Sequence, residues 1–589
     1  MENGIFHSDS GKGMWKMKVF VNHIGFERWD DKAAVLEAGK EKIEVWVERE
    51  DGERFPVNMS GPCRIREWSG GWYYFLDFSH IRTSGNYRIA GMADGIRFQS
   101  ELFPVADYPL YLRMVNASRT YLKGERASGE WLKADRSVAF DGKRKGILDL
   151  HGGWYDATGD FGIHLTQLSH TAVYNPMQSL LPAYVCFDVA ERMEKEKLEN
   201  CRILRKELLD EAYWGADYGM RLYQEGGSFI RSVDRGEAFG DEQHRKIDYE
   251  YFRFSGHEED KSYLTEEIED RNYETGLRSG AGLAIAVLAQ AAGQGGASGE
   301  HSCKEYLRTA REAFSYIIKN NEKHISDGRW NFLDWYCGLA AALELYKVTG
   351  EDEYLEKCRD LEKGMEEYLV EMEEGVWFVS RGKELYFHPS DEGFPLLVLM
   401  KYGQAEPRER ARERVVELVK KAFLHLMSIS GGPFGYAAFT WRKDGKERNR
   451  YFFPHDTKAA PWWQGENGRI ASLAAAALRF SGMKEAEDIK DRLRAFAQRQ
   501  LDWIMGCNPF DSCMIDGFGR NNIQYFFKNQ YDFINSPGGI CNGITARESD
   551  DSGLEFIMEP TEDCDDNWRW AEQWLPCAAW YLYAAGWKL

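Results

Sequence analysis

The stretch GLRSGAGLAIAVLAQAAG, residues 276–293, shows the pattern that decides the fold class of most of this chain. Its apolar residues recur at spacings of three and four, which is the period of an α-helix. It ends in Gly, as helices often do. The same periodicity recurs along the chain after residue 106, with few strand signals in between. The further segments are 108–122, 174–193, 201–224, 306–321, 335–350, 354–369, 394–403, 408–427, 468–482, 485–506 and 568–586.

About a dozen helices without a sheet predict either an α-solenoid or helix pairs closed into a barrel. We find no fixed-period sequence repeat, and this favours the closed barrel. The first hundred residues differ, because short runs of β-branched and aromatic residues alternate with turn signals, as in MKVFVNHIGF (17–26) and GWYYFLDFS (71–79). That pattern of short strands and turns predicts a small antiparallel β-sandwich. We therefore expect a β-sandwich over 1–105 and an all-α domain over 106–589.

The composition excludes several classes of partner. A formal net charge of -20 and a pI of about 5.3 argue against binding to nucleic acid or to an anionic membrane surface. The first eighteen residues show no apolar core of a secretory signal, so we expect a cytoplasmic protein. Eleven cysteines without C-x-x-C spacing predict reduced thiols and no zinc cage. Twenty tryptophans exceed the needs of the core, so some are expected to line a surface on which sugar rings stack.

A loop with the sequence HGGWYDATGDFGIH, residues 151–164, places Asp156 and Asp160 four residues apart among glycines and aromatics. The residues alone leave three interpretations open. The two carboxylates could grip one water as a general base. They could form a metal site with His151 or His164. They could also belong to a solvated loop.

A partner acid is predicted in DDNWRWAEQWLPCAAW, residues 565–580. Glu572 is expected one turn into a helix, flanked by Trp568, Trp570 and Trp574. Aromatic walls would raise the pKa of its carboxyl and keep it protonated, as a general acid requires. The alternative is a first-turn glutamate stabilised by the helix dipole, which would lower the pKa.

Two further loops combine planar side chains with polar tips, as a sugar requires. They are PHDTKAAPWWQGENGR (454–469) and MIDGFGRNNIQYFF (514–527), and the glycines of the second lack the spacing of a phosphate-binding loop. The predicted substrate-binding residues are Trp154, Tyr155, His455, Asp456, Trp463, Glu466, Arg520, Asn521, Asn542, Trp568 and Trp570.

Taken in order, these pieces resemble glycoside hydrolase family 9. The resemblance rests on VFVNHIGF (19–26), GGWYDATGDFG (152–162), GLRSGAGLAIAVLA (276–289), DWIMGCNPFDSCMIDGFG (502–519) and WRWAEQWLPCAAW (568–580). It implies an (α/α)6 barrel that follows an immunoglobulin-like domain, and hydrolysis with inversion. The sequence has no Asp-x-Asp-x-Asp-Gly loop, so we expect no metal or cofactor. It also implies that Asp160 is the catalytic base, Asp156 its partner on the nucleophilic water, and Glu572 the general acid.

Two departures from the family bear on the substrate. Its endo-acting cellulases usually carry Asp-Ala-Gly-Asp, one residue shorter than Asp-Ala-Thr-Gly-Asp here, and a His-Arg pair that is missing from NSPGGICNGITARE (535–548). The chain looks more like the exo-acting branch, with exo-β-D-glucosaminidases and β-glucosidases. This implies release of glucosaminide or glucoside units from the non-reducing end of short chito- or cello-oligosaccharides.

Three alternatives remain open at this stage. One is an endo-β-1,4-glucanase, and another is a non-catalytic carbohydrate-binding protein. The third is a metallohydrolase that uses His151, Asp156, Asp160 and His164.

Overall fold

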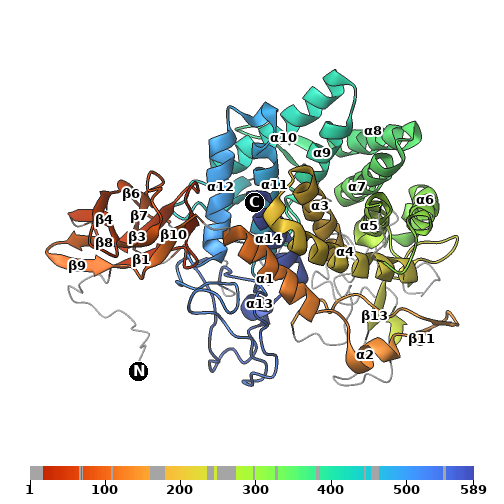
Figure 1. The fold of residues 1–589 in the computed structure, drawn as a ribbon, viewed down its shortest axis with the longest axis horizontal. Helices are drawn as coiled ribbons and strands as arrows, with labels where there is room; N and C mark the ends of the chain where they lie inside the picture. The colour runs from red at the N-terminus through yellow and green to blue at the C-terminus, as the bar shows by residue number, and fades with distance from the viewer. Residues whose placement is uncertain are drawn as a thin grey trace.

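The computed structural model has a β-domain at the N-terminal end and a larger helical domain beside it (Figure 1). The residues that it describes are 17–40, 42–65, 68, 71–107, 110–158, 180–234, 245–248, 273–295, 299–325, 329–379, 385–443, 446–452, 463–547 and 552–589.

The β-domain consists of two sheets whose apolar faces pack together. One sheet has the order β1-β3-β7-β6, and the other has the order β2-β10-β8-β4-β5 with β9 paired to β8. Phe26, Phe78 and Phe103 meet edge-on or tilted inside this core, with ring centroids 5.6–5.7 Å apart. The strands are β1 (Lys18–Val21), β2 (Phe26–Glu27), β3 (Ala33–Ala38), β4 (Ile43–Arg49), β5 (Arg54–Pro56), β6 (Asn58–Cys63), β7 (Trp72–Asp77), β8 (Gly85–Ala93), β9 (Ile96–Gln99) and β10 (Phe103–Ala106).

The two domains meet closely. The last strand of the β-domain ends at Ala106, and the first helix begins at Leu110. Polar side chains of the β1–β2 turn reach the helical domain, where the Asn22 amide donates to Asp502 at 2.9 Å and His23 lies 2.9 Å from Asp511. The β-domain is thus fixed against the end of the helix Lys490–Ile504 (α12) and the segment that follows it.

The helical domain carries the helices expected from the apolar periodicity. They are α1 (Leu110–Gly124), α2 (Gly129–Ala134), α3 (Leu181–Lys195), α4 (Arg202–Leu222), α5 (Gly282–Gly293), α6 (Cys303–Asn320), α7 (Phe332–Thr349), α8 (Asp352–Glu366), α9 (Phe394–Ala405), α10 (Glu409–Ile429), α11 (Asn467–Ser481), α12 (Lys490–Ile504), α13 (Trp568–Ala571) and α14 (Leu575–Lys588). Short 3-10 or π turns lie at Glu199–Cys201, Leu277–Ala281, Asn321–His324 and Lys484–Ala486.

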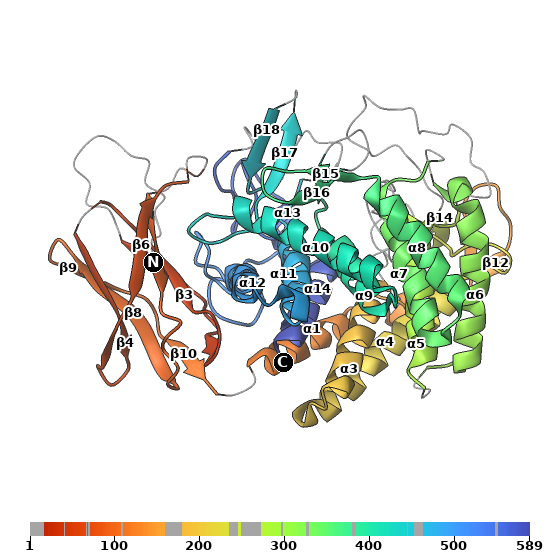
Figure 2. The same ribbon diagram turned by 90° about the horizontal axis from the view of Figure 1, so that it is seen from above.

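Helix contacts close into a double ring among the described residues. Helices α14, α3, α5, α7, α9 and α11 touch one another in that order, and α11 returns to α14. Each of them packs against one outer helix, which is α1, α4, α6, α8, α10 or α12 respectively. Figure 2 shows these helices side by side, with the β-domain at one end of the molecule. The arrangement agrees with helix pairs that close on themselves and not with an open solenoid.

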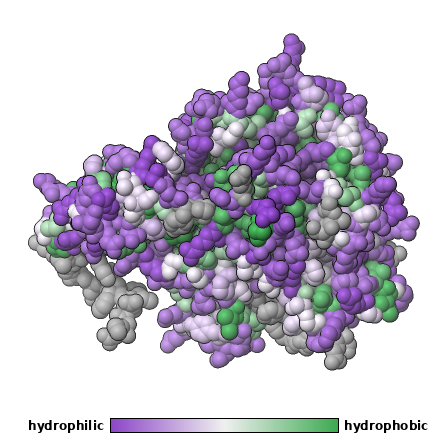
Figure 3. All heavy atoms as spheres, in the orientation of Figure 1, coloured by the Kyte–Doolittle hydropathy of each residue, from purple (hydrophilic) through white to green (hydrophobic). Residues whose placement is uncertain are grey.

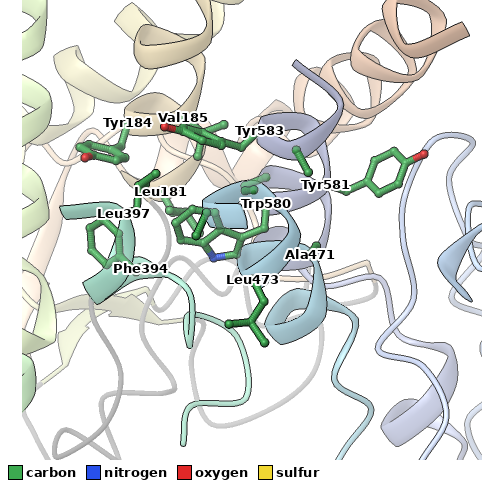
Figure 4. Close-up of a cluster of buried hydrophobic side chains, with 14 of the residues drawn as sticks. Leu181, Tyr184, Val185, Phe394, Leu397, Ala471, Leu473, Trp580, Tyr581 and Tyr583 are labelled. Carbon is green, nitrogen blue, oxygen red and sulfur yellow. The ribbon is translucent and has the colours of Figure 1, made fainter. Parts of the chain in front are cut away.

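The interior of the ring is filled by side chains from the inner helices. Figure 4 shows Trp580 of α14 between Phe394 of α9, Leu473 of α11 and Leu181 of α3. Trp580 is fully buried, and its indole N–H donates to Asp391 at 2.6 Å. These helices are apolar on most sides because each one is covered both by its neighbours and by an outer helix.

The helical domain departs from an all-α prediction in its connections. Short strands form three small sheets: β12-β11-β14-β13, β15-β16 and β17-β18. Their bounds are β11 (Val138–Phe140), β12 (Ile147–Leu148), β13 (Ser232–Asp234), β14 (Lys246–Asp248), β15 (Leu369–Glu371), β16 (Val376–Phe378), β17 (Phe439–Lys443) and β18 (Lys446–Arg450). All of these strands except β17 and β18 have only two or three residues, which is below the length at which alternation can be recognised in a sequence.

The predicted helix over 568–586 is in fact broken in two. Helix α13 ends at Ala571, and α14 begins at Leu575, with Pro576 in its first turn. Proline lacks a backbone N–H, and in a helix its ring clashes with the carbonyl four residues earlier, which is here that of Glu572. Glu572 and Trp574 have extended backbone, with ψ of 132° and 135°. Glu572 therefore follows a short helix and does not stand in the first turn of a long one.

The outside of the molecule is mostly polar in the orientation of Figure 3. Within the described part of the chain, no helix combines the length and apolar character needed to cross a bilayer. All eleven cysteines are free thiols, in agreement with the prediction from their spacing.

Candidate active site

The loop that holds Asp156 runs directly beside the segment that holds Glu572. Ala157 pairs with Trp574 as an antiparallel bridge, although they are far apart in the sequence. A backbone hydrogen bond of 3.0 Å flanks the bridge on each side. Asp156 precedes one bridging residue, and Glu572 lies two positions before the other. The tertiary structure thus brings two of the three predicted carboxylates to one place.

Side-chain bonds reinforce this pairing. The Thr158 hydroxyl donates to the Gln573 side chain at 2.8 Å. The same Gln573 oxygen accepts the backbone N–H of Ser536 at 2.7 Å, and its amide donates back to the Ser536 carbonyl at 2.9 Å. One fully buried glutamine therefore ties the early loop, the late loop and the segment after α13 together.

Asp156 is nearly buried, with 3% of its surface exposed. Its Oδ2 accepts a hydrogen bond from the indole N–H of Trp574 at 3.1 Å. The indole fixes the direction of this carboxylate without neutralising it. Asp160 lies outside the described residues.

Glu572 is partly exposed at the end of α13. Its Oε2 is 3.3 Å from the amide nitrogen of Asn542, which also donates to the Trp568 carbonyl at 3.0 Å. Cys577 and Tyr121 are electrostatically coupled to Glu572, but burial raises the pKa of both groups, so they stay neutral near pH 7. A carboxyl group in this position can exchange a proton with a ligand.

Tryptophans surround this segment with different exposure. Trp568 is partly exposed, whereas Trp570 is buried and its indole donates to Thr545 at 2.8 Å. Trp463 packs edge-on against Trp570, with centroids 5.8 Å apart. The Arg569 guanidinium lies over both Trp463 and Trp568, at 5.2 Å and 4.7 Å from the ring centroids. Of the three predicted tryptophans here, Trp568 has the most surface to offer to a sugar.

Trp154 and Tyr155 are placed differently from the prediction. Trp154 is fully buried, and its indole donates to Glu211 at 2.9 Å. Tyr155 is 2% exposed, and its hydroxyl contacts Ser128. Both rings pack the loop against its surroundings, Trp154 on Glu211 and Tyr155 on Ser128, because all of residues 152–158 are buried. We assign them to packing and not to substrate contact.

Glu466 is likewise engaged within the core. Its Oε2 accepts hydrogen bonds from Arg469 at 2.8 Å and from the Tyr436 hydroxyl at 3.1 Å. Arg469 also binds Glu392 at 2.8 Å. All three charged side chains are buried, and burial raises the pKa of Glu392 to about 7. This ion triad holds the start of α11 and leaves Glu466 unavailable to a ligand.

Arg520 and Asn521 face the domain boundary. The Arg520 guanidinium binds Asp511 at 2.7 Å, and its backbone N–H reaches His23 of the β-domain at 3.3 Å. Asn521 donates to the Asp511 carbonyl at 2.7 Å. These contacts stabilise the late loop, so the structure does not bring these two residues to Glu572. His455 and Asp456 lie outside the described residues.

In the described part of the chain, no group of three or more His, Cys, Asp or Glu side chains is placed to hold an ion. His151 is paired with Asp149, with Nδ1 2.5 Å from the carboxylate. His164 lies outside the described residues.

One residue of the site, Gln573, was not predicted, and its adjacency to Glu572 was the only signal in the sequence. Asn542 was predicted to bind substrate, but it is fully buried and lies against Glu572. Their roles depend on partners from distant segments, which no local pattern contains.

A closed double ring of helices, a β-domain beside it, and adjoining segments that carry Asp156 and Glu572 are features expected of a carbohydrate-active enzyme. Comparison with known families agrees. Residues 115–536 match the model of glycosyl hydrolase family 9, and residues 16–95 match the cellulase N-terminal ig-like domain. The chain belongs to glycosyl hydrolase family 9 and is an O-glycosyl hydrolase.

Its relatives are distant. The chain is 21% identical over 532 residues to a xyloglucan-specific endo-beta-1,4-glucanase, BoGH9A, of Bacteroides ovatus. The matched residues cover 86% of this chain and 81% of the relative. A metagenome-derived family 9 endoglucanase matches with a TM-score of 0.62 at 16% identity, over 97% of this chain and 98% of that one. A structure described as Bacteroides ovatus GH9 matches with a TM-score of 0.61 at 15% identity, over 97% of this chain and 98% of that one. At these identities the structures establish a common fold.

Proposed function

We propose that this protein hydrolyses β-linked gluco- or chito-oligosaccharides with inversion at the anomeric carbon. Asp160, with Asp156, holds the attacking water and takes its proton, while Glu572 protonates the departing oxygen. The observation that carries this proposal is the bridge between Ala157 and Trp574, which aligns the segments of Asp156 and Glu572. An inverting pair requires carboxyl groups about 6.5–9.5 Å apart to admit the water. The double ring of helices would be the (α/α)6 barrel that supports them.

We further propose exo-acting cleavage from the non-reducing end of short oligosaccharides. The support is the extra residue between Asp156 and Asp160 and the missing His-Arg pair in residues 535–548. Short substrates also suit the cytoplasmic location that we propose. The second candidate is endo-β-1,4-glucanase activity. It is favoured by the activities for which the relatives are named, one of them specific for xyloglucan.

The sugar at the non-reducing end is proposed to be a glucoside or a glucosaminide. An ammonium group would need an acidic partner. Glu466 is removed as a candidate because Arg469 and Tyr436 already occupy its Oε2 inside the core. Asp456 remains as the acidic candidate for a 2-amino sugar among the predicted residues.

The test is a substrate panel with product analysis. Purified protein is incubated with p-nitrophenyl β-glucoside and β-glucosaminide, with cello- and chito-oligosaccharides, and with xyloglucan. Release of single sugars from one end supports exo cleavage, whereas a spread of intermediate products identifies the endo alternative. Proton NMR during the first turnovers should show the α-anomer as the initial product. No hydrolysis of any β-linked substrate would indicate a sugar-binding protein, and activity lost on chelation would indicate a metallohydrolase.

A further inference from the structure

The side chain of Asn542 lies against the carboxyl group of Glu572. Its Nδ2 is 3.3 Å from Glu572 Oε2 and 3.0 Å from the Trp568 carbonyl. The backbone N–H of Asn542 also donates to the Glu572 carbonyl at 2.8 Å. One residue therefore holds both the backbone and the side chain of the predicted acid.

The Asn542 segment is locked in place. Its carbonyl accepts the backbone N–H of Asn467 at 2.9 Å, at the start of α11. A Cβ at Gly465 would stand 2.3 Å from the Asn542 backbone, and a Cβ at Gly543 would stand 2.8 Å from the Asn467 side chain. Gly543 also has a φ of +112°, which favours glycine. Asn542 is fully buried in this clamp, so its amide cannot turn outward to a substrate.

The chemistry of the amide decides which carboxyl oxygen can carry the proton. An amide N–H only donates, so the oxygen that it faces must accept. When Glu572 is protonated, Oε2 is the acceptor and the proton resides on Oε1. We propose that Asn542 is a positioning residue that directs the acidic proton to Oε1 and stabilises the carboxylate left after transfer. This inference rests on the proposed function, in which Glu572 is the acid.

The hydrolytic step moves one proton at each carboxyl group. Water attacks the anomeric carbon and loses a proton to the base carboxylate. The bond between the anomeric carbon and the glycosidic oxygen breaks, and that oxygen takes the proton from Glu572 Oε1. The negative charge that appears on Glu572 is then shared with the Asn542 N–H, and a hydrogen bond to a charged group is stronger than one to a neutral group.

The leaving-group dependence of the rate tests this role. The variant Asn542→Ala is assayed on two aryl β-glycosides of the preferred sugar. A 2,4-dinitrophenolate leaves without protonation, whereas a p-methoxyphenolate needs the acid. We expect kcat on the methoxyphenyl substrate to fall about ten- to hundredfold, because the acid is misplaced. The change on the dinitrophenyl substrate should stay below about threefold, since that step bypasses the acid.

Asn535→Ala is the matched control. Asn535 is also buried, and its amide donates to the Ala571 carbonyl at 3.2 Å, so it supports the same segment without touching the carboxyl group. Loss of the Asn535 amide should change kcat on both substrates by the same factor. Equal losses on both substrates in Asn542→Ala would overturn the inference, because a merely structural residue gives that result.

A second variant, Asn542→Asp, keeps the shape if the alanine variant does not fold. A carboxylate beside Glu572 raises the pKa of the acid, so the basic limb of the pH–rate profile should move to higher pH. Burial raises the pKa of Cys577 and of Tyr121, two groups whose pKa values also depend on the charge of Glu572, so both stay neutral near pH 7. An unmoved limb would count against the inference.

Glu572→Gln separates failure of this inference from failure of the proposed function. If it loses activity selectively on the methoxyphenyl substrate while Asn542→Ala does not, the positioning role alone is wrong. If Glu572→Gln retains activity on both substrates, the acid assignment itself is wrong.

Discussion

Replacing Gln573 by alanine should damage stability and catalysis together. Its side chain makes three buried hydrogen bonds, one to the Thr158 hydroxyl and two to the backbone of Ser536. Each such bond contributes about 1 kcal/mol net, so their loss should lower the free energy of unfolding by about 3 kcal/mol. Thr158 is two residues from Asp156, and Gln573 is next to Glu572. Because both carboxylates lose support, we expect kcat to fall about ten- to hundredfold.

Gln500→Ala provides the control for this prediction. Gln500 of α12 is also fully buried, and its side chain makes three hydrogen bonds of 2.8 Å to the backbone of Gly435, Ala437 and Phe496. Both variants are compared by urea unfolding followed by tryptophan fluorescence and by kcat on the best substrate. We expect similar shifts in the urea midpoint but a kcat loss only in Gln573→Ala. Equal kcat in the two variants would refute the coupling between this glutamine and the catalytic geometry.

The remaining predictions concern the carboxylates, a glycine and a buried acid. Asp160→Asn and Glu572→Gln should each lower kcat by about 10²–10⁴-fold with an unchanged thermal midpoint, and near-wild-type turnover would remove that residue from the mechanism. Gly465→Ala should lower the free energy of unfolding in urea by about 1–3 kcal/mol and should also lower kcat, because the new Cβ would stand 2.3 Å from backbone atoms. Gly431→Ala is the control, since its Cβ would meet nothing within 4 Å, and it should change neither quantity. Burial raises the pKa of Asp502 to about 6, so the folded state binds its proton more tightly than the unfolded state, and wild-type stability falls as pH rises from about 4 to 6. Urea unfolding at several pH values gives the free energy of unfolding of Asp502→Asn and of the wild type. The difference between them should grow by about 3 kcal/mol in favour of the variant across that window and stay constant above it. A difference that does not change with pH would contradict the raised pKa.

Most elements of the fold could be predicted because their signals are local. The helix at residues 282–293 is apolar nearly all round, which only a doubly covered helix tolerates. The glycine- and aromatic-rich loop and the late acid stood out by composition. The break before α14 was missed, although Pro576 was visible, because the apolar period continues across it.

The binding residues were harder to predict, because a residue type does not reveal which way its side chain points. Trp154 and Trp568 look alike in the sequence, yet one is fully buried on Glu211 and the other is partly exposed beside Glu572. Glu466 reads as a polar tip in a loop, but its partner Arg469 stands one turn later in a helix. A local pattern gives the inventory of groups and not their directions.

The sequence by itself determined the helical periodicity, the β-sandwich texture and the identity of the acidic residues, because each of these depends on neighbours within a few positions. Only the tertiary structure decided that Gln573 holds Thr158, 415 positions away, and that Asn542 faces the carboxyl group of Glu572. The physical reason is that a buried polar group must find its hydrogen-bond partner wherever folding places one. That partner comes from a distant segment, and its distance and direction exist only once the helices have closed on one another.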